Sequence, residues 1–245
     1  MMHFIQLSNL MGKLKSWMGI RRDNFSLCAA LKRCKERELQ VRTIIDVGAS
    51  DGRWSLVARK FFPQAFCLLI EAQKTHKQSL EKLKARMNGF DYIIAAAGDQ
   101  NGTIFFDAGD LFGGLATTTP VGNHCISVPM VTVDEEVSRR NLSPPYLLKL
   151  DTHGFELPIL EGAKNTLASA ALVVIETYNF RLTDNSLKFH EMCSFMERKG
   201  FSCIDFSEPM HRPGDKAFWQ VDLFFIPSDS GAFSSNRYLP QEVSI

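Results

Sequence analysis

One short stretch, residues 43–52 (TIIDVGASDG), constrains the fold more than any other part of the chain. It begins with β-branched and apolar residues, a pattern typical of a strand that is buried on both faces of a parallel sheet. Two glycines interrupt the run, and apolar residues at helical spacing follow, at Trp54, Val57, Ala58 and Phe61. A strand that turns through glycines into a helix is how an open α/β sheet builds a ligand site. Gly48 and Gly52 would let the backbone approach a ligand, and the helix would offer it free N–H groups.

The spacing of the glycines distinguishes between ligands. A dinucleotide-binding loop requires G-x-G-x-x-G, but Ser50 and Arg53 occupy its second and third glycine positions. The pattern is instead D-x-G-x-x-x-G, formed by Asp46, Gly48 and Gly52, and it resembles the glycine loop of class I S-adenosylmethionine (SAM) methyltransferases. SAM has no pyrophosphate but carries an ammonium group, which nearby carboxylates suit. The alternative is a glycine turn that serves only to reverse the chain.

An acid after the next apolar run strengthens the case for a nucleoside-type ligand. Glu71 ends the run 66–70, roughly 20 residues beyond the glycines, where doubly wound folds place a carboxylate that binds ribose hydroxyls. An acid after a strand is commonly only a solvated loop residue. Together, however, the glycine loop and Glu71 favour a nucleoside.

Composition and charge exclude several classes. With 245 residues and 45% hydrophobic content, the chain can bury one sizeable core and carry an appendage. A net charge of +1 gives no support to nucleic-acid binding, which favours a basic domain. The six cysteines lack metal-ligand spacing, so we expect a reduced, cytoplasmic protein. No stretch approaches the roughly 20 apolar residues of a membrane span, and the first residues lack the features of a secretory signal.

The charge is nevertheless uneven along the chain. Residues 1–42 hold nine Lys/Arg and three Asp/Glu, whereas the remainder holds 19 against 24. The spacing of Phe4, Leu7, Met11, Leu14 and Met18 predicts an amphipathic helix, and a second helix is expected over about 26–39. This basic helical N-terminal arm could contact a membrane surface or a partner enzyme. The interpretation that we favour is that it packs on its own acidic body and caps the cofactor cleft.

From residue 43 onward, strands and helices alternate at the pace of βαβ units. Strands are expected at 43–48, 66–71, 92–97, 146–150, 172–175, 201–206 and 217–226, and helices at about 51–62, 75–87, 157–167 and 186–199. The last two strands have no helix between them and should pair antiparallel. The expected fold class is therefore α/β: a Rossmann-like class I methyltransferase fold with a seven-stranded, mostly parallel sheet and an antiparallel last strand. The domain would span 43–227, followed by a flexible tail at 228–245.

One long segment interrupts this alternation. Asn101-Gly102 is a typical hairpin-turn signal and introduces an expected strand at 103–106. A second strand, expected at 126–133, should pair with it. The segment 109–124 between them is too long for an ordinary connection. It is either a flap that covers the substrate, which we favour, or a loose insert.

Carboxylates gather at the expected carboxyl ends of the strands, where open α/β sheets bind ligands. These positions are Asp46 and Gly48, Glu71, Ala97 to Asp99, Asp151 to Glu156, and Glu176. Part of this pattern is expected by chance, since polar residues commonly follow strands. Asp151 and His153 would lie nearest the switch point of the sheet, facing the glycine loop.

Several ordered motifs resemble the FkbM-type SAM-dependent methyltransferases. Residues 149–156 (KLDTHGFE), with 160–163 (LEGA) behind them, look like the K-x-D-x-x-G-x-E…L-x-G-A signature of that family. Residues 45–49, 131–134 and 175–176 resemble its other motifs. The chain departs from the family at Ser50, at Ala72-Gln73 and, beside the expected methyl-transfer point, at Thr152-His153. The resemblance implies SAM as cofactor and O-methylation, commonly of sugar or polyketide hydroxyls. The positions that we expect to bind the cofactor are Asp46, Gly48, Ser50, Gly52, Glu71, Ala97 and Asp99.

The two expected catalytic residues are Asp151 and His153. Positioning is the main resource of methyl transfer, worth about 7–11 kcal/mol when the reactants are well oriented. A base adds roughly 10²–10⁴ in rate, and a histidine, which titrates near neutrality, suits that role. Asp151 would orient His153 or bind the ammonium group of SAM. Alternatively, His153 is a rim residue without a chemical role, or Asp151, Glu156 and Glu176 hold a divalent metal.

Three functions remain open at this point. The first is a SAM-dependent O-methyltransferase acting on a small-molecule or glycan acceptor. The second is an NAD(P)-type oxidoreductase, against which Ser50 and Arg53 argue. The third is a non-catalytic SAM-binding or scaffold protein of a glycan-assembly complex.

Overall fold

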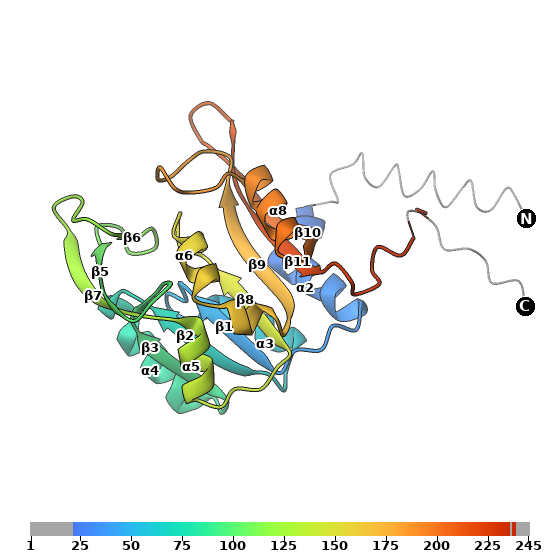
Figure 1. Ribbon diagram of the computed structural model, residues 1–245, viewed down its shortest axis with the longest axis horizontal. Helices are drawn as coiled ribbons and strands as arrows, with labels where there is room; N and C mark the ends of the chain where they lie inside the picture. The colour runs from blue at the N-terminus through green and yellow to red at the C-terminus, as the bar shows by residue number, and fades with distance from the viewer. Residues whose placement is uncertain (1–21, 236, 239–245) are drawn as a thin grey trace, which may run out of the picture.

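The computed structural model describes residues 22–235 and 237–238, and its centre is a seven-stranded sheet between two layers of helices (Figure 1). The strand order is β10-β11-β9-β8-β1-β2-β3. Five neighbouring strands are parallel: β1 (Thr43–Val47), β2 (Phe66–Glu71), β3 (Phe90–Ile94), β8 (Tyr146–Leu150) and β9 (Ala170–Tyr178). The predicted helix over Phe4 to Met18 lies outside the described residues.

The last two strands close one edge of the sheet. β11 (Phe218–Pro227) pairs antiparallel with β9, and β10 (Phe201–His211) pairs antiparallel with β11. β11 is therefore the strand that runs against the others. The predicted seven-stranded, mostly parallel sheet with an antiparallel last strand is confirmed.

Helices bury both faces of the sheet. One face is covered by α2 (Leu27–Glu36), α3 (Arg53–Phe61) and α4 (Lys77–Arg86). The other is covered by α5 (Val133–Arg139), α6 (Glu156–Glu161), α7 (Lys164–Leu167) and α8 (Phe189–Arg198). Neighbouring strand residues alternate between the two cores, as Leu147 and Leu148 do, and this explains the continuous apolar runs in the sequence. In the part of the chain that the structure describes, no helix combines the length and apolarity of a membrane span.

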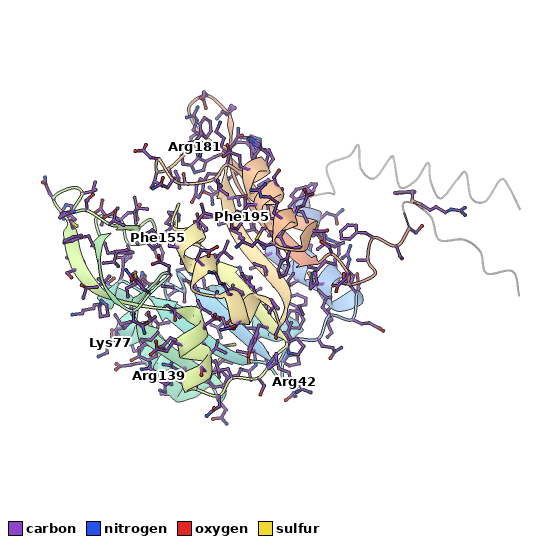
Figure 2. The ribbon with its side chains drawn as sticks, in the orientation of Figure 1. Arg42, Lys77, Arg139, Phe155, Arg181 and Phe195 are labelled. Atoms are coloured by element: carbon purple, nitrogen blue, oxygen red, sulfur yellow. The ribbon has the colours of Figure 1, made fainter. Side chains whose placement is uncertain are left out.

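A second, four-stranded sheet stands beside the first, at the left of the view and away from β10 and α2 (Figure 1). It contains the predicted hairpin, formed by β5 (Gly102–Asp107) and β7 (Cys125–Val131), together with β6 (Leu115–Thr117) and β4 (Ala96–Ala97). Phe155, labelled in Figure 2, packs against the apolar clusters of both sheets. The small sheet is thus attached to the main core close to the start of α6.

Several boundaries differ from those predicted, and three of them lie close to the small sheet or to α6. The strand expected over 92–97 begins at Phe90 and breaks at Ala95, because the chain there leaves β2 and joins β7 of the small sheet. The strand expected to reach residue 133 ends at Val131, because the Thr132 hydroxyl accepts the N–H of Glu135 and starts a helix. The helix expected over 157–167 is divided into α6 and α7. Two 3-10 turns, Arg22–Phe25 and Lys74–His76, complete the described elements.

The second predicted helix of the N-terminal arm packs on its own body. In α2, Leu31 and Cys34 are fully buried against the sheet. The Arg33 guanidinium binds the Asp205 carboxylate of β10 through two hydrogen bonds, of 2.5 and 2.9 Å. This helix therefore belongs to the helical layer of the domain.

The division between α6 and α7 yields a test of packing. A Cβ atom at Gly162 would lie 2.0 Å from the backbone oxygen of Gly98, so the helix and the β4 region are in direct contact. We expect Gly162→Ala to lower the free energy of unfolding by about 1–3 kcal/mol through overpacking, measured by urea denaturation. Gly214→Ala is the matched control, because no atom lies within 4 Å of a Cβ there. Equal stability of the two variants would contradict the contact.

Candidate active site

A cavity of about 250 Å³ lies where the carboxyl ends of β1, β2 and β8 meet. Its wall is formed by the glycine loop after β1, the residues after β2 and the residues after β8, with the segment 111–116 on the remaining side. Six of the predicted site residues line it, namely Gly48, Ser50, Glu71, Ala97, Asp151 and His153. Segments more than 100 residues apart in sequence thus share one pocket.

The glycine loop has the close approach that its sequence indicated. Gly48 has a φ of +73°, and a Cβ atom there would lie 2.0 Å from the backbone oxygen of Asp151. Only glycine can therefore bring the end of β1 against the end of β8. Ser50 also has a positive φ, +52°, and its N–H points back to the end of β2.

Glu71 joins the first loop to the second. Its two carboxylate oxygens accept the N–H groups of Ser50 and Gln73, each at 2.7 Å, and the side chain is buried. Burial raises the pKa of Glu71. A carboxylate oxygen can accept more than one hydrogen bond, so Glu71 can still accept from a ligand hydroxyl.

Three of the predicted cofactor-binding residues do not line the cavity. Asp46 is fully buried beneath the loop, where Ser55 donates to its Oδ2 atom at 2.7 Å and Lys149 Nζ lies 3.0 Å from its Oδ1 atom. Gly52 faces α4, since a Cβ there would lie 2.6 Å from Leu83. Asp99 is exposed. Asp46 is therefore placed to act through Lys149, and a direct role of any of the three remains a prediction.

His153 lies between two carboxylates. Its Nδ1 atom is 3.2 Å from Glu176 Oε2 and 2.7 Å from the Tyr178 hydroxyl, while its Nε2 atom is 3.8 Å from Asp151 Oδ1. Burial disfavours the charged ring, but Glu176 and Asp151 outweigh it and raise the pKa of His153 to about 9. At neutral pH the ring is an imidazolium, held by acids on both sides.

This arrangement favours a hydrogen-bonded charge cluster over a metal centre. One atom each from Asp151, His153 and Glu176 lies within 4.8 Å of the others, which is a possible ligand set. However, Nδ1 faces Glu176, whereas Nε2 contacts the backbone carbonyl of Phe112 and lies 3.8 Å from Asp151, so no single ring nitrogen faces both carboxylates. Glu156, the other acid expected to bind metal, instead accepts the Gly154 N–H at 2.8 Å and lies at the start of α6. Glu156 also accepts the Thr152 hydroxyl, so it holds the turn that precedes α6.

The predicted flap covers the cavity. The backbone carbonyls of residues 110–112 accept hydrogen bonds from three side chains that lie far away in sequence. Gln73 Nε2 donates at 2.9 Å, and Nε2 of His76 and of His153 lie 2.9 and 3.0 Å from their carbonyl partners. The substrate role of the flap stays a prediction, but its place over the pocket is confirmed.

Several residues of the site escaped the sequence analysis. Tyr178 donates to Glu176 at 2.5 Å, and Gln220 of β11 donates to the other oxygen of the same carboxylate. Lys149, which appeared only as a letter of the family signature, lines the cavity and is buried. No local pattern marks these residues, because each acts on a partner in another strand or loop.

The fold and the site together define a class of protein. A sheet with this strand order, which carries a glycine loop and a ribose-type acid at one cavity, is the Rossmann-like class I fold of SAM-dependent methyltransferases. The family model described as "Methyltransferase FkbM domain" matches residues 46–203, which is more than half of the chain. The chain belongs to the FkbM methyltransferase family.

Solved structures share the fold at low sequence identity. The methyltransferase FkbM from Methylobacillus flagellatus KT is 15% identical, with a TM-score of 0.50 over 75% of this chain and 43% of that one. This chain thus spans less than half of that protein. Magnesium protoporphyrin IX methyltransferase from Synechocystis PCC 6803, solved with bound SAM, is 11% identical, with a TM-score of 0.46 over 82% of this chain and 76% of that one. Precorrin-6y C5,15-methyltransferase from Geobacter metallireducens GS-15 is 12% identical, with a TM-score of 0.42 over 82% and 87%. A search of the curated proteins found no match.

The charge state of His153 can be measured directly. We expect NMR titration of the histidine side chains to give His153 a pKa of about 9. Glu176→Gln should lower that pKa, because Asp151 would then be the only one of the two carboxylates left to counteract the effect of burial. Glu191→Gln, which removes an exposed partner of Arg181, is the control and should leave the value unchanged. A wild-type pKa near 6.5 would contradict the assignment of His153 as an imidazolium held by Glu176 and Asp151.

Proposed function

We propose that this protein is a SAM-dependent O-methyltransferase that transfers a methyl group to a hydroxyl of a saccharide or secondary metabolite. The observation that carries the proposal is the single cavity in which Gly48 and Glu71 meet Asp151 and His153. Family membership supports methyl transfer, and the site supplies the groups that a sulfonium nucleoside and a hydroxyl acceptor require.

Two unpaired polar atoms support a bound cofactor. Among the described residues, three buried side-chain atoms lack a hydrogen-bond partner, and two of them, Ser50 Oγ and Trp54 Nε1, belong to residues that line the cavity. Because buried polar groups are nearly always paired in folded proteins, a polar ligand would satisfy them. Glu71 would accept hydrogen bonds from ribose hydroxyls. The residues present therefore fit SAM, which when bound supplies an electrophilic methyl group.

The charges of the site suit a cationic ligand. Asp46, Asp151 and Glu176 surround the two cations Lys149 and His153, so carboxylates are in excess. SAM carries an ammonium group and a sulfonium, and Asp151, one third exposed at the cavity, is the residue that we expect to receive the ammonium or to orient His153. The flap segment would exclude water from the cavity during methyl transfer.

His153 is the proposed base. It must first be neutral, and with a pKa of about 9 only about 1% of it is neutral at pH 7. A cationic ligand nearby would lower this pKa and increase the neutral fraction. A ring nitrogen of His153 would then take the hydroxyl proton of the acceptor, and Glu176 would stabilise the resulting imidazolium.

The remaining parts of the proposal concern partners and location. We propose a small-molecule or glycan acceptor, no nucleic acid, and a cytoplasmic location. All six cysteines are free, as a reducing compartment requires. The basic residues that precede α2 could contact a membrane surface or a partner enzyme. A non-catalytic SAM-binding scaffold is the alternative, and SAM binding without transfer to any acceptor would favour it.

Cofactor binding gives the first test. Calorimetric titration should detect binding of SAM and of its demethylated product, and Glu71→Gln should weaken both by at least about tenfold, because each hydrogen bond to a charged group contributes roughly 1.5–3 kcal/mol. Glu81→Gln, at an exposed acid on α4, is the matched control and should bind like the wild type. Failure to detect either ligand at millimolar concentration would contradict the proposed function.

Transfer gives the second test. Labelled SAM and fractionated cell extract, incubated with and without the protein, should identify the acceptor. On that acceptor the rate should rise with pH from 7 and level off by about pH 9, because the base must be deprotonated. His153→Gln should lower the rate by roughly 10²–10⁴ and flatten the profile. Wild-type rates in this variant would end the base assignment.

A further inference from the structure

We propose that Lys149 is a positioning residue, which fixes the cofactor loop after β1 against the acceptor-side motif after β8. Its ammonium links the backbone carbonyl of Gly48 to the carboxylate of Asp151, with Asp46 as the buried anion that anchors it. The inference rests on the proposed function only for its ligand-binding measurement. The contacts themselves are formed between residues of the protein and do not depend on a ligand.

The Lys149 ammonium contacts acceptors from three separate places. Lys149 on β8 is the register partner of Asp46 on β1. Nζ lies 3.0 Å from Gly48 O, 3.0 Å from Asp46 Oδ1 and 3.3 Å from Asp151 Oδ2. The contact with Gly48 O is a hydrogen bond, and the contacts with the two carboxylates are ion pairs. The ammonium thus holds the end of β1 and the end of β8 at once.

Burial makes these contacts strong. The Lys149 side chain is 5% exposed and that of Asp46 is 0% exposed, and the Trp54 ring lies 5.8 Å from Nζ. A buried ammonium is tolerated only when it is paired and hydrogen-bonded. Burial opposes its charge, but Asp151 and Asp46 outweigh that effect and raise the pKa of Lys149 above its ordinary value. Lys149 is therefore a cation over the whole physiological pH range.

The arrangement exceeds what charge balance requires. The pair between Lys149 and Asp46 alone would neutralise the buried lysine, yet the ammonium also donates to Gly48 O and forms an ion pair with Asp151, and both of these residues line the cavity. The two loops already touch at Gly48, so a shift of one displaces the other. Because a misplacement of about 1 Å can cost roughly 10²-fold in rate, a fixed distance between the loops matters for transfer.

The test compares two variants that differ only at Lys149. Asp46→Asn keeps the lysine and its two loop contacts, whereas the double variant Asp46→Asn/Lys149→Met removes the buried charge pair together. Replacing both charges is far milder than stranding one, so we expect the double variant to fold. Lys84→Met, which breaks a half-exposed lysine pair with Asp91, is the control for the substitution type.

Two readouts separate positioning from stability. Amide hydrogen exchange without ligand should accelerate about tenfold at 48–52 and 151–155 in the double variant, and change little in Asp46→Asn or Lys84→Met. SAM affinity should fall about 10–100-fold in the double variant relative to Asp46→Asn, and should be unchanged in Lys84→Met. The acid limb of the pH dependence of SAM binding should also move to higher pH in the double variant, because Lys149 lowers the pKa of Asp151 and is then absent.

Each alternative outcome has a definite meaning. Equal exchange in Asp46→Asn and the double variant would show that Lys149 merely pairs with Asp46, and so would wild-type exchange and affinity in the double variant. Either result would overturn the proposal. If the wild type bound no SAM, the proposed function would fail, and the exchange measurement would still decide the role of Lys149. If the double variant unfolded, exchange in Asp46→Asn would decide: acceleration at both segments would contradict the proposal, and wild-type protection would support it.

Discussion

The buried charges beneath the cavity are the constraint on which the rest of the site depends. Lys149 and Asp46 lie on neighbouring parallel strands in the core of the sheet, where an unpaired charge would be very costly. Lys149 also donates to Gly48 O and pairs with Asp151, so it contacts both strand ends at the point where Gly48 approaches Asp151 closely. The cavity is therefore a consequence of the sheet register, with the glycine loop allowing the contact and the lysine holding it.

The flap depends on the same cluster. Its carbonyl groups are held by Gln73 and His76 on the β2 side of the cavity and by His153 on the β8 side. The ring of His153 thus contacts the flap through one edge and Glu176 through the other. His153 therefore contributes both to holding the flap over the cavity and to the electrostatics of the proposed base.

The sequence predicted the sheet well because each buried strand is a local apolar run. A run of that kind can be recognised without knowing which strand it pairs with. It predicted Gly48, Ser50, Glu71, Asp151 and His153 at one cavity, because the carboxyl ends of parallel strands share an edge. It failed at Ala95, where an apolar run does not encode which sheet the chain joins. Residues such as Lys149, Tyr178 and Gln73 were missed because their roles arise from contacts between distant segments.

The charge balance of the proposed reaction links these features. The carboxylates around His153 stabilise positive charge next to the cavity, and they raise its pKa to about 9 in the free protein. With a sulfonium bound, these acids would face a second cation, so His153 would lose its proton more readily. Methyl transfer from a sulfonium leaves a neutral thioether, and the hydroxyl proton passing to His153 would restore the imidazolium. The carboxylates would then face the same total positive charge before and after transfer. In the empty site they oppose the loss of the proton from His153, and during the reaction they would favour its return.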